Sequence, residues 1–235
     1  MLIIMASPNA VLRQGQPDQE IVNLLIKAKA DSYPVGLISN HGEPEWFEEL
    51  FGDSGVQFLC TPGRQDGKIV ATNAEKFDLN SHDVLVLATK NEDVQMGKNG
   101  GAVLIAAGWS TDTQVKSLGI CVDNAQQLQE IIDLSAGWLG YWWFKVDKPR
   151  YKVRALADLS SYGKTNAQQT FSSKLTQTVK GGGNRLNALL AITARSLLTD
   201  ENIAESDLLW GVYPSSSSNN DDNEVLSDFT HRLRT

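Results

Sequence analysis

The sequence has few of the residues from which metal centres and redox sites are usually built. Its 235 residues include 2 cysteines and 3 histidines, and Cys60 and Cys121 lie far apart. Zinc and iron–sulfur sites need such residues at close spacing, so we expect two reduced, packed thiols instead. A Walker loop and a dinucleotide fingerprint are also absent, because the glycine triplet 181–183 is not followed by Lys-Ser or Lys-Thr.

Long apolar runs are missing as well. The longest ones are far shorter than the roughly 18 to 20 residues that cross a bilayer. The opening segment 1–5 is apolar, but it is short and lacks the basic lead of a signal peptide. We therefore expect a cytoplasmic protein with no membrane segment.

The net charge of −7 is unevenly distributed along the chain. Residues 1–133 contain 9 basic and 18 acidic residues, whereas residues 134–235 contain 12 and 10. An acidic first part does not favour nucleic acid as a partner. Basic and aromatic residues are interleaved over 142–154. This pattern is found in nucleic-acid-binding segments and also on a strand with one solvated basic face, and the second interpretation is favoured.

Apolar strands alternate with amphipathic helices over the first part of the chain. We expect strands at 2–5, 34–39, 56–60, 83–88 and 102–108, and helices at 17–30, 43–52 and 123–134, the last capped by Asp123. The turn-rich segment 61–69 is predicted to be a loop. The alternation predicts an α/β fold with a Rossmann-like parallel sheet, whose binding crevice lies at the carboxyl ends of the strands.

A composition shift near residues 134–140 predicts a domain boundary. We place a first domain at 1–134 and a second, smaller α/β region at 135–235. The second region contains an amphipathic helix at about 185–199, an apolar strand at 208–214 and a Ser/Asn/Asp-rich tract. The aromatic stretch 138–144 is either part of a core or a surface for a protein partner.

Polar residues stand directly after the predicted strands. Ser7 and Asn9 follow the first, Ser39 and Asn40 the second, and Asp93 the fourth. The order and spacing of these turns resemble a haloacid dehalogenase-like (HAD-like) domain over residues 1 to about 133. An alternative for positions 7–9 is an ordinary Ser-Pro-Asn turn, and Ser39 and Asn40 also suit turn or helix caps.

The resemblance implies a degenerate catalytic site. In such phosphohydrolases, acids at the places of Ser7 and Asn9 attack phosphorus and protonate the leaving group, and acids at the places of Thr89 and Asp93 hold magnesium. Only Asp93 is acidic here, so we expect no bound metal. Mg²⁺ is expected only if the protein retains phosphohydrolase or phosphoribosyltransferase activity. The family also has a phosphate-stabilising lysine before the fourth strand; Lys68 and Lys76 are available, and neither is assigned.

The second region resembles part of a type I phosphoribosyltransferase. An apolar strand there ends in Pro214-Ser215-Ser216, just before a further predicted helix. The resemblance implies that Ser215 and Ser216 contact a pyrophosphate. In the first domain, the HAD-like resemblance implies that Ser39 and Asn40 contact a phosphoryl group. The family's acidic ribose-phosphate motif does not occur before Thr235. A Ser/Asn surface loop without a ligand is the competing interpretation.

Three functions are consistent with these observations. The leading hypothesis is a non-catalytic HAD-like module that senses a phosphorylated small molecule or binds a partner. Fusions of this kind resemble proteins of bacterial stress and phage-defence operons, which is an analogy and not a site argument. The alternatives are a phosphoribosyltransferase whose diphosphate-binding motif lies outside this chain, and a weak HAD-like phosphatase. Whether this chain alone is an enzyme is left open.

Overall fold

The computed structural model describes residues 2–136 and 144–155, and a few helical positions, 173, 176–177, 187–191 and 193. Contacts within the chain divide it into two compact units, residues 1–136 and 137–235. The first unit is an α/β domain, and nearly all of it is described.

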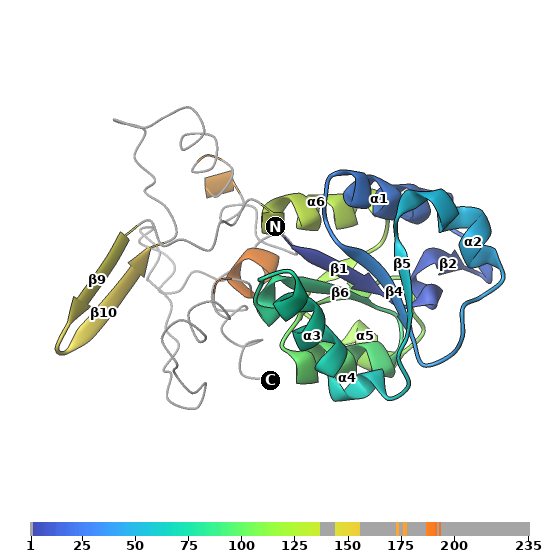
Figure 1. The fold of residues 1–235 in the computed structure, drawn as a ribbon. Helices are drawn as coiled ribbons and strands as arrows, with labels where there is room; N and C mark the ends of the chain where they lie inside the picture. Colours follow the sequence, from blue (N-terminus) through green and yellow to red (C-terminus); the bar gives the residue numbers. More distant parts are fainter. Residues whose placement is uncertain are drawn as a thin grey trace. The chain divides into compact units, whose positions relative to one another are not determined.

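A six-stranded parallel sheet forms the centre of the first unit (Figure 1). Its strand order is β5-β4-β1-β6-β7-β8, and every neighbouring pair is parallel. The strands are β1 (Ile3–Ala6), β4 (Val35–Ser39), β5 (Gln57–Cys60), β6 (Val84–Ala88), β7 (Val103–Ala107) and β8 (Cys121–Val122). The predicted α/β class and Rossmann-like parallel sheet are confirmed by this topology.

Helices cover both faces of the sheet (Figure 1). They are α1 (Gln19–Ala30), α2 (Trp46–Phe51), α3 (Lys68–Lys76), α4 (Asn91–Gly100), α5 (Thr113–Lys116) and α6 (Ala125–Ala136). Helix α1 packs with α6 on one face, while α3, α4 and α5 lie on the other. Because β1, β4 and β6 are enclosed on both sides, every residue in them is buried, which explains their continuous apolar sequences.

Short irregular elements connect these helices and strands. A 3₁₀ turn (Pro8–Val11) leads from β1 into a small hairpin of β2 (Leu12–Arg13) and β3 (Gln16–Pro17). Three further 3₁₀ turns are Gly52–Ser54, Arg64–Asp66 and Ser81–Asp83.

The core beneath α3 and α4 is apolar and close-packed. It consists of Ile3, Met5, Ile38, Val70, Ala74, Val84, Val86, Met96 and Ala102. Fully burying one aliphatic side chain of this size contributes about 1.5–3 kcal/mol. The two faces of the sheet together therefore hold the ends of its strands in fixed positions.

Three expectations from the sequence were wrong. The segment predicted as a loop contains a 3₁₀ turn and the start of α3, whose first and last residues are Lys68 and Lys76. Helix α6 is capped by Asn124, whose Oδ1 accepts from Gln127 N at 2.9 Å, and not by Asp123. Both cysteines are free, but Cys60 is exposed instead of packed.

In the second unit, strands β9 (Phe144–Lys148) and β10 (Tyr151–Ala155) form an antiparallel hairpin. Residues 187–191 of the helix predicted at 185–199 are helical. Ser215, Ser216 and the strand before them lie outside the described residues, as does most of the aromatic stretch 138–144. No helix among the described residues is long and apolar enough to cross a membrane.

Two glycines let the backbone before α3 pack directly against the end of α4. A Cβ on Gly67 would collide with the Gly100 backbone nitrogen, and a Cβ on Gly100 would lie 2.5 Å from Cβ of Val70 and 2.7 Å from Gly67 O. Asn99 Nδ2 also donates to Gln65 O at 2.7 Å. The 3₁₀ turn Arg64–Asp66 is thereby fixed against α4.

Replacing Gly100 with alanine is expected to destabilise the first unit. Alanine favours a helix over glycine by up to about 1 kcal/mol, but the collision with Val70 Cβ and a backbone oxygen cannot relax through a flexible side chain. We expect a net loss of about 1–3 kcal/mol by urea unfolding. The control is Gly42→Ala, where the added Cβ meets no atom within 4 Å. Equal stabilities for the two variants would contradict the close contact.

Candidate functional site at the carboxyl edge of the sheet

Turns from four neighbouring strands meet at one edge of the sheet. Ser7 follows β1, Ser39 ends β4 and Asn40 follows it, residues 61–64 follow β5, and residues 89–93 follow β6. Because the strands are parallel and adjacent, their carboxyl ends lie side by side. The sheet thus brings together the sequence candidates Ser7, Ser39, Asn40 and Asp93, with Asn9 in the turn after Ser7.

Asp93 is the centre of this edge and is fully buried, with a relative exposure of 0%. It is the third residue of α4, and its Oδ2 accepts from the backbone nitrogens of Thr89 at 2.8 Å and Lys90 at 3.0 Å. These contacts cap the helix, where a carboxylate also interacts favourably with the helix dipole. The sequence around Asp93 therefore places the carboxylate by ordinary helix-capping geometry.

Two hydroxyl groups complete the contacts of this carboxylate oxygen. Ser7 Oγ lies 3.0 Å and Thr89 Oγ1 3.1 Å from Oδ2, and the two hydroxyl oxygens are 2.8 Å apart. Each hydroxyl has one proton, so one donates to Asp93 while the other donates either to Asp93 or to its fellow hydroxyl. Ser7 and Thr89, two of the positions at which the HAD-like pattern has acids, thus form a hydrogen-bonded group with Asp93.

The second oxygen of Asp93 faces a residue that the sequence analysis did not select. Oδ1 makes no well-aligned hydrogen bond, but it lies 2.5 Å from Nη1 of Arg64 in an ion pair. Nη1 also donates to Ile38 O at 3.1 Å, and Arg64 is only 4% exposed. Arg64 lies in the glycine-rich segment that the sequence predicted as a loop after the third strand, and no side chain of that segment was selected as a candidate.

Asn40 holds the turn that carries Arg64. Its Oδ1 accepts from Gly63 N at 3.0 Å and from Arg64 N at 3.3 Å. Ser39 acts locally, since its Oγ accepts from His41 N at 3.0 Å. In contrast, Lys68 is a surface residue, with its side chain 85% exposed and paired with Asp66 at 3.1 Å.

The residues at this edge do not fit a magnesium ion. Magnesium needs free carboxylate oxygens in near-octahedral geometry, but one oxygen of Asp93 already accepts from backbone and hydroxyl donors and the other contacts a guanidinium. Within the described part of the chain, no cluster of three or more His, Cys, Asp or Glu side chains could hold a metal.

An open hollow of about 130 Å³ lies beside the ion pair. Its walls are basic, hydroxyl, amide and acidic side chains together with a proline and a histidine: Ser7, Pro8, Asn9, Ser39, Asn40, His41, Arg64, Lys90 and Glu92. Lys90 is exposed, and Asn9 and Glu92 are partly buried. The hollow can therefore offer positive charge and several hydrogen-bond donors to a small anion, with one opposing carboxylate at Glu92.

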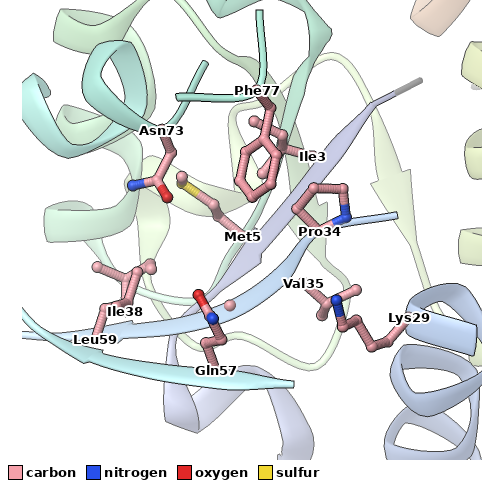
Figure 2. A pocket seen from close by; sticks show the side chains of 11 residues that line it. Ile3, Met5, Lys29, Pro34, Val35, Ile38, Gln57, Leu59, Asn73 and Phe77 are labelled. Carbon is pink, nitrogen blue, oxygen red and sulfur yellow. The ribbon is translucent and has the colours of Figure 1, made fainter. Parts of the chain in front are cut away.

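A second hollow, of about 40 Å³, lies elsewhere and is lined by apolar residues together with Lys29, Gln57 and Asn73 (Figure 2). It is formed near the starts of β1, β4 and β5 by Ile3, Val35 and Gln57, with Phe77 after α3. Ligand sites in parallel α/β sheets lie at the opposite, carboxyl end of the strands. We therefore place the candidate site at the first hollow.

No protein-family model matches the sequence, and neither does any curated protein. Among solved structures, a cobalt-bound deoxy-D-mannose-octulosonate 8-phosphate phosphatase of Haemophilus influenzae is similar at 10% identity and a TM-score of 0.46, covering 60% of this chain and 91% of its own. Two proteins named as phosphoglycolate phosphatases are also similar. The one from Lactobacillus delbrueckii has 20% identity and a TM-score of 0.42, covering 51% of this chain and 55% of its own. The one from Haemophilus somnus has 13% identity and a TM-score of 0.42, covering 52% of this chain and 60% of its own. Similarities this distant identify neither an activity nor a substrate.

Asp112 provides a pH test of the support beneath the site. Its Oδ1 accepts from Gln114 N and its Oδ2 from Asn91 N, both at 2.8 Å, so it links the starts of α5 and α4. These bonds, that from Gln114 first, lower the pKa of Asp112. A lowered folded-state pKa gives stability that is present above the unfolded value near 3.9 and is lost as the pH falls through the folded value.

We therefore expect Asp112→Asn to lower the melting temperature at pH 7. The difference from the wild type should shrink as the pH falls below about 4, because both proteins then carry a neutral side chain. Melting curves between pH 3 and 7 measure it. A difference that stays constant across this range would show that the charge of Asp112 has no role.

Proposed function

We propose that the first unit is a HAD-like domain that binds a phosphorylated small molecule at the carboxyl edge of its sheet without hydrolysing it. Such a domain serves as a ligand-sensing or partner-binding module. The observation that carries the proposal is the hollow at this edge, where Arg64 and Lys90 line the same space as Ser7, Asn9 and Asn40. Charged and neutral donors converging on one small hollow suit an anion with several oxygens.

The strand order and the turns support the HAD-like assignment. Ser7 follows the central strand β1, Ser39 ends β4 on one side of it, and Asp93 follows β6 on the other. This is the arrangement that the motif order in the sequence implies. The contacts of Asp93 favour binding over hydrolysis. Its carboxylate is the acidic group beside Ser7, and it is already committed to backbone donors and to Arg64.

The test is calorimetric titration of the protein with inorganic phosphate, glycerol 3-phosphate and phosphoribosyl diphosphate. We expect binding of at least one of them, and a higher melting temperature in its presence. A ligand at about 100 times its dissociation constant adds about 2.7 kcal/mol, which raises the melting temperature by several degrees. Lys90→Ala and Ser39→Ala should weaken binding, the lysine change by about tenfold or more because it removes a charged partner.

Lys98→Ala is the matched control for Lys90→Ala. Both residues are exposed lysines of the same segment, but Lys98 lies near the end of α4 and does not line the hollow. The control should bind as the wild type does. Equal losses in both variants would indicate a general charge effect, and no binding of any of the three compounds would refute the proposal. Magnesium-dependent phosphate release that Asp93→Asn abolishes would establish the phosphatase alternative instead.

A further inference from the structure

The ion pair between Arg64 and Asp93 is unusual for its depth in the protein. Among Lys, Arg, Asp and Glu residues in the described part of the chain, these two are the buried ones. An isolated buried carboxylate is strongly destabilising, so its charge needs a partner or a metal ion. In this site the partner comes from the chain itself.

We propose that the Arg64 guanidinium takes the place of a divalent metal ion at the carboxyl edge of this sheet. It supplies a permanent positive charge next to Asp93 and links the strand ends that a metal would otherwise join. Its Nη1 contacts Asp93 after β6 and donates to Ile38 O in β4. Through Asp93, the same network reaches Ser7 after β1.

The position of Arg64 is built into the surrounding backbone. Asn40 holds the Gly63 and Arg64 nitrogens on one side, and the contact between Gly67 and Gly100 fixes the following turn on the other. A guanidinium stays charged at any pH at which the protein folds. The chain therefore carries its own cation, and a divalent ion can approach Asp93 only if this turn is displaced.

A competing explanation is that Arg64 pairs with Asp93 only until a metal ion arrives and displaces it. The two explanations differ in what metals do to the wild-type protein. If Arg64 is a permanent substitute, added metal does not stabilise the fold. If it is a placeholder, a divalent ion at saturating concentration raises the melting temperature by several degrees.

The experiment is thermal melting of the full chain with EDTA, Mg²⁺, Mn²⁺ or Ca²⁺, each ion at millimolar concentration. We expect the wild type to melt at the same temperature in all four conditions. Arg64→Ser should melt roughly 10 °C lower in EDTA, because it leaves Asp93 buried without a partner. Part of this loss should be recovered with Mn²⁺ or with methylguanidinium, which can enter the space that the side chain leaves.

Three variants make the result specific to the pair. Lys68 is a basic residue four positions after Arg64 that is also paired with an acid, Asp66, but it is exposed. The Lys68→Ala variant should therefore melt within about 1–2 °C of the wild type. Arg64→Lys keeps the charge and should lose less than Arg64→Ser. Arg64→Ser combined with Asp93→Asn should lose less than the two single changes added together and should show no recovery with Mn²⁺.

Two results would overturn the inference. One is stabilisation of the wild type by a divalent ion that disappears in Asp93→Asn, which would make Arg64 a placeholder. The other is a melting temperature of Arg64→Ser equal to that of the wild type, or additive effects in the double variant, which would show that the pair does not hold the site together. Should Arg64→Ser not fold, Arg64→Lys and the double variant carry the comparison.

Discussion

The contact between the Arg64 guanidinium and the Asp93 carboxylate is the interaction on which this end of the domain depends. Parallel strands end at the same edge, and the turns after them expose backbone groups that need partners. Asp93 satisfies the nitrogens at the start of α4, and Arg64 neutralises Asp93 while bonding the end of β4. Removal of either charge leaves the other buried, so the two residues act as one unit.

The same pair limits the chemistry of the site. A carboxylate that accepts several internal hydrogen bonds and contacts a cation has a reduced capacity to bind a metal or to move a proton. The open hollow next to it keeps Lys90, Asn9 and one face of the Arg64 turn available to a ligand. The arrangement consequently suits recognition of an anion better than its hydrolysis. This agrees with the proposed binding function and with the proposal that Arg64 takes the place of a metal ion.

Much of the fold follows from local sequence patterns, whereas the central contact of the site does not. Continuous apolar runs correctly predicted the five longer strands of the six-stranded sheet. In β1, β4 and β6 every residue is buried, so these strands need no polar alternation. Strand β8, of two residues, is too short to produce such a pattern. Helix α3 was missed because its apolar face is narrow, formed by Val70 and Ala74. Arg64 lies in the turn just before this helix, and its contacts are with Asn40 and Asp93, which are distant in the sequence. Asp93 was selected because it stands where the HAD-like pattern has an acid after the fourth strand. Its partner was not selected, because the pairing joins two turns that are far apart in the sequence.

The most direct test of this account is a high-resolution crystal structure of the protein grown with manganese, using the anomalous scattering of the metal to locate it. If Arg64 takes the place of a metal ion, its Nη1 remains in contact with the Asp93 carboxylate, with Ser7 and Thr89 on the other oxygen and no anomalous peak near them. A manganese ion bound to Asp93, with the Arg64 side chain moved away, would contradict the central claim.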